Sequence, residues 1–497
     1  MTARKTHTMR TLKLTALVVV IAIVGLAAVI GFNTLANTSK QIAVAAIPRV
    51  VVDTDAAAKR LAEAIRFRTI SSFDHPDQDA DALRGMQAHI AANFPAFHAA
   101  TRREIVAGYS LLYTWQGSDT SLKPVALTAH QDVVPVAPGT EKDWQHPPFD
   151  GVIADGYVWG RGSWDDKGNL YAMLEAAEAL ATQGFKPKRT IYFAFGHDEE
   201  VAGTRGAKGI AALLAQRNVR LDYILDEGLL ITEGILKGLD KSAALIGVAE
   251  KGYATLVLTA HATPGHSSMP PRETAIGMMA TALTRLEDNK LPMQARGAVA
   301  EMFDTLAPEM SGFNRIVLSN LWLFKPLLLK QLEKTGPTEA SVRTTTALTI
   351  FNAGDQDNVL PGNAQATVNF RLLPGDTQTS VTEHVSSTIA NPKIDIAPFP
   401  GNTDPPRVTA TSSDAYRALT RTIRETFPDV IVAPGLMVAA TDSRHYAEVA
   451  DSIFRFSPVR ATAEDLKRFH GSNERLSIEN YGDMIRFYRR LMESTAG

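Results

Sequence analysis

Four sites in the first half of the chain follow short apolar, strand-like runs and carry acidic or imidazole side chains. The sites are His130-Gln131-Asp132, Asp165-Asp166, Glu199-Glu200 and Asp226-Glu227. Open α/β sheets place their ligands just beyond the carboxyl ends of their strands, so a chain with this repeated pattern is expected to bring the four sites together at one edge of a sheet. The pattern therefore predicts an α/β fold whose functional centre is built from strand ends.

The spacing of His130 and Asp132 assigns them complementary roles. Residues 125–129 form an apolar run that predicts a short buried strand, and side chains two apart on an extended backbone point to the same side. A metal-bound imidazole usually donates its second ring N–H to a carboxylate, which fixes the tautomer and raises the basicity of the ligating nitrogen. We therefore expect His130 to bind metal and Asp132 to orient its ring.

The other sites add carboxylates and a distant imidazole. Asp165 lies in a glycine-rich turn before a segment of helical composition, where its carboxylate can bridge two cations. The adjacent carboxylates of Glu199 and Glu200 repel each other unless a cation or a proton separates their roles, so one is expected to bind metal and the other to carry protons. With His470 from far along the chain, the set offers nitrogen and oxygen ligands that suit two zinc ions, with cobalt or manganese as substitutes.

The residue strings around these sites resemble a known family, the co-catalytic zinc metallopeptidases that include aminoacylases, carnosinases, glutamate carboxypeptidases and yeast carboxypeptidase S. The resemblance runs from about Ala57 to the C-terminus and is strongest to the branch of carboxypeptidase S and the N-fatty-acyl-amino-acid synthase/hydrolases. It rests on Ala-His-Gln-Asp-Val-Val-Pro (129–135), Trp144 with Pro-Pro-Phe (147–149), and Gly-His-Asp-Glu-Glu (196–200). These strings are long and specific, and the resemblance implies the catalytic fold of that family, with a central mixed sheet.

The resemblance implies a role for each residue of the predicted centre. The implied metal ligands are His130 on one ion, Glu200 and His470 on the other, Asp165 as the bridge, and Glu227 as the remaining ligand. Asp226 stays open as an alternative to Glu227. Glu199 would be the general base. The family also places a cis peptide after the bridging aspartate, here between Asp165 and Asp166.

Four further residues are implied to contact the substrate. His266, in Pro-Gly-His-Ser, matches the family histidine that stabilises the developing oxyanion, often across a dimer, and Asn358 matches a position that hydrogen-bonds the substrate. Arg371 and Arg444 are candidates for recognition of a free α-carboxylate, because a guanidinium can grip a carboxylate with two hydrogen bonds. Either arginine could instead form an internal ion pair.

Composition excludes several classes of protein. The chain has no cysteine, so disulfides, thiolate metal ligands and thiol catalysis are excluded. The net charge is −2 with interspersed signs, and we therefore expect no nucleic-acid partner. A length of 497 residues is too great for one compact domain and predicts two.

The N-terminal segment carries the second strong signal. Residues 14–32 contain no charge and are long enough to cross a hydrocarbon core, and they follow Arg4, Lys5, Arg10 and Lys13. Since positive charge stays on the cytoplasmic side, we predict a cytoplasmic tail (1–13), an uncleaved single-pass anchor (14–32) and a catalytic body outside that membrane, in a periplasm or a lumen. The alternative is a cleaved signal peptide and a secreted protein, but the apolar run exceeds a usual signal-peptide core and no Ala-x-Ala site stands directly at its end.

Beyond the anchor, the pattern predicts a catalytic domain that is interrupted by an insertion. After a linker at 33–56, the catalytic domain would comprise residues 57–252 and 408–497. Residues 253–407 read as strand, helix, strand, strand, helix, strand, which is the split βαβ order of an α+β domain. The resemblance implies that this inserted domain is a lid, which mediates dimerisation in many relatives, so a homodimer is expected.

Within the expected lid, residues 299–334 form an unusual insertion centred on the apolar run 318–329, Leu-Ser-Asn-Leu-Trp-Leu-Phe-Lys-Pro-Leu-Leu-Leu. A segment that is apolar almost all round is usually buried core, and that is the first expectation. The alternatives are a pocket for an acyl chain or a patch that faces a membrane.

Together these features predict a zinc-dependent amidohydrolase. Its expected reaction is cleavage of the amide bond of N-acyl amino acids, N-fatty-acyl ones among them, with synthesis as the reverse reaction. The alternative is a carboxypeptidase or dipeptidase that acts on short peptides with a free C-terminus. A third and weaker hypothesis is a membrane-tethered binding protein without catalysis, which the complete set of ligands and the retained Glu199 oppose.

Overall fold

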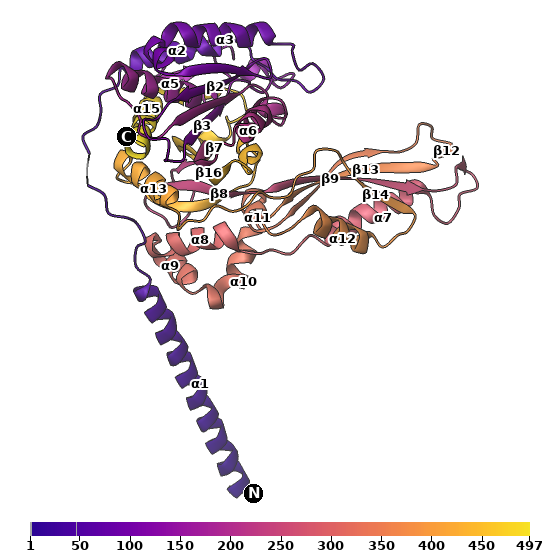
Figure 1. The fold of residues 1–497 in the computed structure, drawn as a ribbon. Coiled ribbons are helices and arrows are strands. Elements are labelled where there is room, and N and C mark those ends of the chain that lie inside the picture. The colour runs from indigo at the N-terminus through magenta and orange to yellow at the C-terminus, as the bar shows by residue number, and fades with distance from the viewer. Residues whose placement is uncertain (1, 46) are drawn as a thin grey trace.

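The computed structural model describes residues 2–45 and 47–497, and a mixed eight-stranded sheet lies at its centre (Figure 1). The strand order is β1-β2-β6-β3-β7-β16-β8-β15. The bounds are β1 Arg102–Val106, β2 Ser110–Trp115, β3 Val125–His130, β6 Ile191–Gly196, β7 Leu221–Thr232, β8 Ala243–Glu250, β15 Ile431–Met437 and β16 Ala450–Ala461. Because β6, β3, β7 and β16 run parallel, their carboxyl ends meet at one edge of the sheet.

Helices cover both faces of this sheet, which explains why its strands are apolar at almost every position. On β6, Phe193 and Phe195 face one core, while Ala194 faces the other, as the alternation of side chains along a strand requires. The larger core includes α2 (Thr54–Ile65), α5 (Lys167–Thr182) and α15 (Ile478–Ala496), and the smaller one includes α6 (Gly206–Gln216). The flanking helices are α3 Ala80–Asn93, α4 Pro95–Ala100 and α13 Asp414–Thr426.

A small three-stranded sheet joins a strand near the C-terminus to two short strands from the first half of the chain. Its order is β17-β5-β4, with β4 at Val152–Ala154, β5 at Tyr157–Trp159 and β17 at Arg475–Ser477. The antiparallel pairing of β17 with β5 places the residues before Arg475 next to those after Trp159. Short helical turns η1 (Glu141–Asp143), η2 (Glu199–Val201), η4 (Asp442–Tyr446) and α14 (Ala463–Leu466) complete this part of the molecule.

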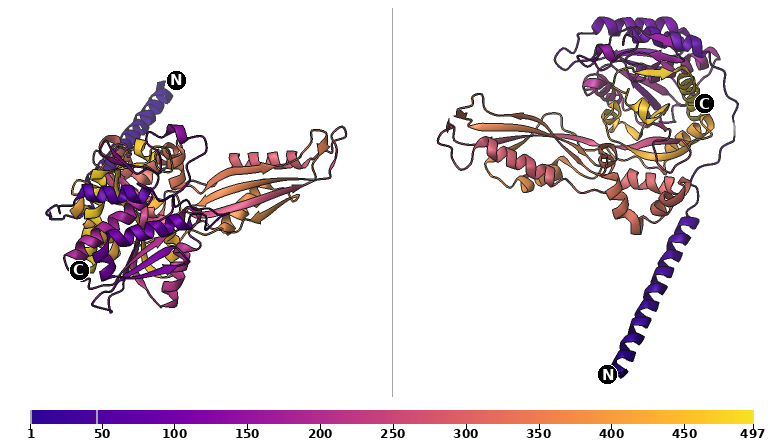
Figure 2. Two further views of the ribbon diagram at one scale, coloured as in Figure 1. Left: turned by 90° about the horizontal axis from the view of Figure 1, so that it is seen from above. Right: turned by 180° about the vertical axis from the view of Figure 1, so that it is seen from behind.

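A second, four-stranded sheet forms an arm that extends from the body (Figures 1 and 2). Its strand order is β11-β13-β9-β14, with bounds β9 Gly252–His261, β11 Thr345–Asn352, β13 Asn363–Leu372 and β14 Ile394–Pro398. Helices α7 (Ala275–Asp288) and α12 (Gln378–Ile389) pack on it through a separate apolar core. The elements therefore follow the strand-helix-strand-strand-helix-strand order that the sequence predicts. The short pair β10 (Gly265–His266) and β12 (Val359–Leu360) lies at the far end of the arm.

The insertion in the arm folds as a group of short helices beside the body. They are α8 Gly297–Leu306, η3 Ala307–Glu309, α9 Gly312–Ser319, α10 Leu321–Leu332 and α11 Gly336–Val342, and α8 packs against β15. The expectation that the apolar run is buried core is wrong for α10, because none of its residues is buried. Leu321, Leu328 and Leu329 pack partly against the main core, and the other side of the helix is exposed.

The N-terminal helix α1 (Thr2–Ala36) projects away from the body (Figures 1 and 2). Its segment Leu12–Ala36 has a mean hydropathy of 2.9 and no buried residue. Of the helices in the described part of the chain, this one alone is long and apolar enough to cross a membrane.

Candidate active site

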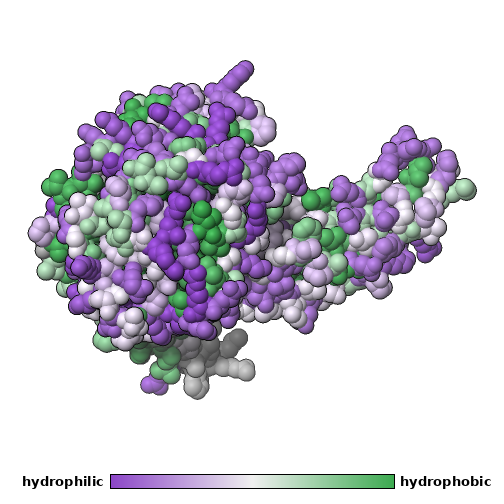
Figure 3. Space-filling model, turned by 45° about the horizontal axis from the view of Figure 1, so that its top comes forward, coloured by the Kyte–Doolittle hydropathy of each residue, from purple (hydrophilic) through white to green (hydrophobic). Residues whose placement is uncertain are grey.

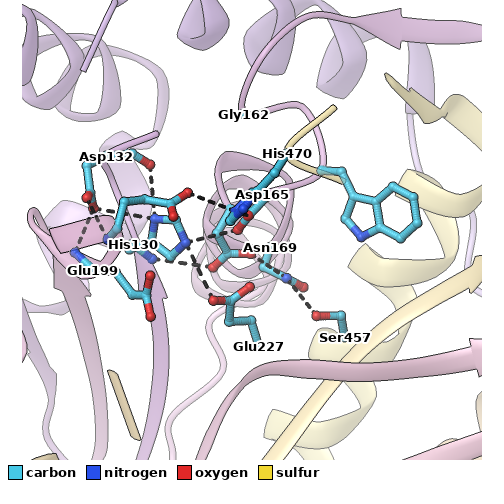
Figure 4. A network of polar contacts seen from close by, with 12 residues as sticks. His130, Asp132, Gly162, Asp165, Asn169, Glu199, Glu227, Ser457 and His470 are labelled. Carbon is cyan, nitrogen blue, oxygen red and sulfur yellow. Dashed lines mark hydrogen bonds and ion pairs between the residues drawn. The ribbon is translucent and has the colours of Figure 1, made fainter. Parts of the chain in front are cut away.

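His130 is the last residue of β3, and its buried ring lies among three carboxylates (Figure 4). Its Nδ1 is 3.0 Å from the backbone carbonyl oxygen of Asp132 and 3.4 Å from Asp132 Oδ1, while its Nε2 is 3.0 Å from Asp165 Oδ1 and 3.5 Å from Glu227 Oε1. One ring nitrogen therefore faces Asp132 and the other faces the centre. This is the arrangement that their spacing in the sequence predicts.

Asp132 also fixes the turn that carries the paired glutamates. Its two carboxylate oxygens accept the backbone N–H groups of Glu199 and Glu200, each at 3.1 Å. Because η2 begins at Glu199, directly beyond the end of β6, these two hydrogen bonds join the ends of the neighbouring strands β3 and β6.

Asp165 is shared by two groups of potential ligands. Its second oxygen, Oδ2, is 2.7 Å from His470 Nε2, which lies 3.4 Å from Glu200 Oε1. The two groups are His130, Asp165 and Glu227, and Asp165, Glu200 and His470, and in each the ligand atoms lie within 4.8 Å of one another. A carboxylate shared between two such groups is the arrangement expected of a site for two metal ions.

The charges at this site fit cations. Burial, together with the neighbouring Asp165, raises the pKa of Glu227 to about 8. Burial alone would lower the pKa of His470, but its contacts with Asp165 and Glu200 raise it to about 10. Glu200 Oε1 is buried and accepts no hydrogen bond from the described residues. Two cations would replace these protons and use the free oxygen, and two imidazoles with three carboxylates are a donor set that zinc accepts.

The structure distinguishes between the two acidic residues that the sequence left open. The carboxylate of Asp226 accepts a hydrogen bond from Thr128 Oγ1 at 2.6 Å and another from the backbone N–H of Ser443 at 2.8 Å. Glu227 instead faces His130 and Asp165. Asp226 thus supports the strand ends, and Glu227 belongs to a group of residues that could hold a metal ion.

Glu199 lies beside this cluster without belonging to either group of ligands. Burial raises its pKa well above the ordinary range, and the nearby carboxylates of Asp442, Glu227 and Glu200 add to this shift. Figure 4 shows its carboxylate next to that of Glu227. Among the described residues none donates a hydrogen bond to its carboxylate, and a carboxylate so close to the cluster is suited to proton transfer.

Glu474 and Arg161 are parts of the site that were not identified from the sequence. The fully buried Glu474 carboxylate accepts the backbone N–H groups of Gly162, Trp164 and Asp165 at 2.9–3.1 Å. Arg161 donates to the other Glu474 oxygen at 2.6 Å and to the carbonyl of His470 at 3.1 Å. Arg161 lies close to Asp165 in the sequence, and Glu474 lies close to His470. Neither position reveals that the two side chains bind each other, because 313 positions separate them. The peptide between Asp165 and Asp166 is cis, as the resemblance implies.

The two arginines expected to bind a carboxylate lie near each other. Arg371 is partly buried with its guanidinium 4.7 Å from the ring centre of Tyr253, and Arg444 donates to the carbonyl of Ala202 at 2.8 Å. Burial and the charge of Arg444 both lower the pKa of Arg371. Among the described residues, no carboxylate lies within ion-pair distance of either guanidinium, so the alternative of internal ion pairs is not observed. Two neighbouring guanidinium groups without a carboxylate partner among the described residues favour an anion.

The structure does not bring His266 or Asn358 to the centre of its own chain. His266 pairs with Val359 between β10 and β12, and the carbonyl of Asn358 accepts the backbone N–H of Ser267 at 3.0 Å. Both residues are exposed. They lie at the far end of the arm, whereas the metal ligands lie at the ends of β3, β6 and β7 in the body (Figure 1).

A mixed sheet with two groups of ligands around one shared carboxylate defines a metallohydrolase of the dinuclear type. The chain belongs to peptidase family M20/M25/M40, whose family model matches residues 126–494. It is thus a metal-dependent hydrolase.

Similar proteins include both branches that the sequence strings suggested. The chain is 41% identical over 483 residues to the probable carboxypeptidase S-like 2 of Dictyostelium discoideum, covering 95% of this chain and 92% of that protein. It is 43% identical over 436 residues to the N-fatty-acyl-amino acid synthase/hydrolase PM20D1 of Xenopus tropicalis, covering 87% and 84%. The M20 family metallo-carboxypeptidase Sso-CP2 of Sulfolobus solfataricus has the same fold, with a TM-score of 0.63 at 17% identity over 88% of this chain and 98% of that one.

Proposed function

We propose that the protein is a dinuclear zinc amidohydrolase that cleaves N-acyl amino acids, long-chain N-acyl ones among them, with synthesis as the reverse reaction. The observation that carries this proposal is the shared Asp165 between two ligand groups, with Glu199 beside them. The acyl specificity is supported by relatives of 41–43% identity that are named N-fatty-acyl-amino acid synthase/hydrolases.

In this proposal each residue of the cluster has a defined task. The residues that would hold the metals are His130 and Glu227 for one ion, Glu200 and His470 for the other, and Asp165 for both. When bound, two zinc ions supply an activated water and polarise the scissile carbonyl. Asp132 keeps His130 in the tautomer that leaves Nε2 free to bind.

Glu199 would handle the proton in both halves of the reaction. Its carboxylate takes a proton from the attacking water and then gives it to the nitrogen of the leaving amine. Burial raises the pKa of the Glu199 side chain, which favours its holding a proton between the two steps. The products are an amino acid and a carboxylic acid. In the reverse reaction the same residues would carry out these steps in the opposite order and form the amide.

Arg371 and Arg444 would select substrates with a free carboxylate. Their proximity and the absence of an ion-pair partner among the described residues support this role. An N-acyl amino acid and a peptide with a free C-terminus both carry such a group, so the arginines serve either substrate.

His266 and Asn358 would act on the centre of a second copy of the chain. Their exposed position at the end of the arm supports a homodimer in which each arm covers the partner's active site. Residues 253–407 would then form the lid and dimerisation domain, between the two catalytic parts 57–252 and 408–497. There His266 would stabilise the oxyanion.

The N-terminal helix would anchor the enzyme in a membrane, with residues 1–13 in the cytoplasm and the catalytic body on the opposite side. The length and hydropathy of Leu12–Ala36 support this, as do the basic residues before it. A signal peptide that is removed remains the alternative, and the N-terminal sequence of the mature protein distinguishes the two.

A carboxypeptidase acting on short peptides is the second candidate function, favoured by the carboxypeptidase S-like relatives. The deciding experiment compares kcat/KM for N-oleoyl, N-acetyl and N-aminoacyl derivatives of the same amino acid, with and without a chelator. The proposal expects the N-oleoyl compound to be the best substrate and the chelator to abolish turnover. Higher kcat/KM for the dipeptide would favour the peptidase, and no metal-dependent turnover on any compound would favour a binding protein.

A further inference from the structure

Helices α9 and α10 carry several large apolar side chains that the described part of the chain leaves exposed. Phe313, Trp322 and Leu327 are exposed by 61%, 60% and 50%. They lie within the segment Gly312–Leu332, which also presents Leu323 to solvent. On the face of the molecule in Figure 3, by contrast, apolar residues lie scattered among hydrophilic ones.

The junction between α9 and α10 is bound directly to the C-terminal end of α1. The buried side chain of Asn320 donates to Thr34 Oγ1 at 3.1 Å and to the carbonyl of Ile30 at 3.3 Å, and accepts from Asn33 Nδ2 at 3.0 Å. Asn37 donates to Ser319 Oγ at 3.2 Å. The position of α9 and α10 along the axis of α1 is therefore defined.

This contact lies at the level where a bilayer surface would be. A helix rises about 1.5 Å per residue, so the uncharged segment 14–32 spans roughly 30 Å, the thickness of a hydrocarbon core. The polar residues Asn33, Thr34 and Asn37 follow at once and make the contacts with Asn320 and Ser319. Figure 1 shows α9 and α10 beside that end of α1, on the side of the body that faces the helix.

The composition of α10 suits the boundary between lipid and water. Trp322 is of the residue type enriched at that boundary, and the exposed Lys325, Lys330 and Lys334 can reach phosphate groups while the leucines stay in the apolar layer. Pro326 lies inside the helix, between the two exposed apolar positions Leu323 and Leu327. Tryptophan and lysine beside exposed leucines are residue types that occur together where a protein meets the surface of a bilayer.

We propose that α9 and α10 insert into the interfacial layer of the phospholipid bilayer that α1 spans. They form a second, in-plane membrane contact that holds the catalytic body at a fixed height and orientation. The inference rests on the anchor in the proposed function and adds a membrane-binding site that is separate from it. The occupant of the apolar surface is the bilayer itself.

The test measures membrane depth at single sites in the full-length protein. Since the chain has no cysteine, one nitroxide label can be introduced at a time by Trp322→Cys, Leu327→Cys or Phe313→Cys. Each protein is reconstituted in vesicles of phosphatidylcholine with a quarter phosphatidylglycerol, and the accessibility of the label to oxygen and to a water-soluble nickel chelate is compared by EPR. Labels in the interfacial layer are expected to be at least several-fold more accessible to oxygen, relative to the chelate, than labels in water.

Matched controls use equally exposed apolar residues elsewhere. Phe73→Cys and Ile105→Cys replace side chains that are 74% and 52% exposed, one between α2 and α3 and the other on β1 at the edge of the central sheet, and both labels should report water. Val24→Cys reports on the anchor. A Val24 label in lipid with the α10 labels in water would overturn the interfacial helix while leaving the anchor intact.

Two other outcomes also contradict the proposal. A Val24 label in water overturns both the anchor and the contact that depends on it. The α10 labels could also prove inaccessible to both oxygen and the chelate, in detergent as well as in vesicles. That result would mean that protein covers this face, which points to a second copy of the chain. Three label positions are used so that the conclusion does not depend on a single substitution that disturbs the fold. Unchanged turnover of a short N-acyl substrate verifies that each labelled protein is native.

Discussion

The Glu474 carboxylate accepts the backbone N–H of Asp165 at 3.1 Å, although 309 positions separate the two residues. The same oxygen accepts Gly162 and Trp164, and the other binds the guanidinium of Arg161. Arg161 in turn donates to the carbonyl of His470. The turn that carries the shared carboxylate and the loop that carries the distant imidazole are thus one hydrogen-bonded unit, so the spacing of the two ligand groups depends on a residue that would bind no metal.

Replacing Glu474 by Gln should therefore weaken metal binding without removing a ligand. The substitution removes the charge that Arg161 faces, and loss of a partner around ligands typically costs about 10–100-fold in metal affinity. Competition with a chromogenic chelator measures the change. Glu464→Gln, at an exposed residue that pairs with Lys467, is the matched control and should bind metal normally. Equal affinity in the Glu474 and Glu464 variants would contradict a positioning role.

Replacing Glu199 by Gln should abolish turnover and leave the metals in place. The side chain keeps its size but loses its proton-transfer function, so kcat should fall by about 10²–10⁴-fold. Glu200→Gln changes the neighbouring residue in the same way but removes a ligand, and should lower metal content as well. Elemental analysis beside kcat separates the two. Near-normal turnover of the Glu199 variant would remove it from the mechanism.

Metal stoichiometry should reveal which ligand serves which ion. His470→Ala removes a member of one group and Glu227→Gln a member of the other, so each variant should lose about one of two metal equivalents. Asp165→Ala changes the residue common to both groups and should lose more than either. Asp226→Asn tests the neighbouring acid, which is engaged with Thr128 and Ser443 and should keep two equivalents. Two full equivalents in the Asp165 variant would refute the shared site.

Much of this centre could be predicted because local spacing determines it. His130 ends strand β3 and Asp132 follows two positions later, and parallel strands bring their carboxyl ends to one edge whatever the intervening sequence. The choice between Asp226 and Glu227 depends on which carboxylate finds Thr128, a contact across two strands that no local pattern encodes. Glu474 was missed for the same reason.

A different limit of the sequence explains why α10 was expected to be buried. Its apolar residues predict that the helix is shielded from water, but the sequence does not say whether protein or lipid shields it. The expectation of buried core failed at this point.

Lys251, at the junction of β8 and β9, should make stability rise with pH. Its buried ammonium donates to the carbonyls of Ala340 and Arg343, and burial lowers its pKa to about 7. Between about pH 7 and pH 10 the unfolded chain binds a proton that the folded chain does not, so the free energy of unfolding gains up to about 1.4 kcal/mol per pH unit from this group. Lys251→Met keeps the aliphatic stem and should remove this dependence.

Denaturant unfolding at several pH values measures the difference between the wild type and the Lys251 variant. That difference should grow in favour of the wild type from pH 7 to pH 10. Lys241→Met removes the same charge from an exposed position at the other end of β8 and should leave the slope unchanged. Parallel curves for the wild type and Lys251→Met would mean that this lysine keeps an ordinary pKa.

The last prediction concerns acyl-chain length. Burial of one methylene contributes about 0.8 kcal/mol, so a site that takes up several more carbons should favour long-chain N-acyl amino acids over N-acetyl ones by orders of magnitude in kcat/KM. Because α10 lies on the surface beside α1, polar substitutions there should act on delivery of the substrate from lipid. Leu323→Asn should lower kcat/KM for N-oleoyl substrates presented in vesicles and leave N-acetyl substrates unaffected.

Leu466→Asn is the control, since Leu466 is exposed to a similar extent, 40% against 36% for Leu323. An equal loss of activity on short and long chains in the Leu323 variant, together with a lower free energy of unfolding, would mean that this side chain only supports the fold. A wild-type enzyme without any preference for chain length would refute the lipid substrate itself and favour the peptidase, because the metals, Glu199 and the two arginines serve both reactions equally.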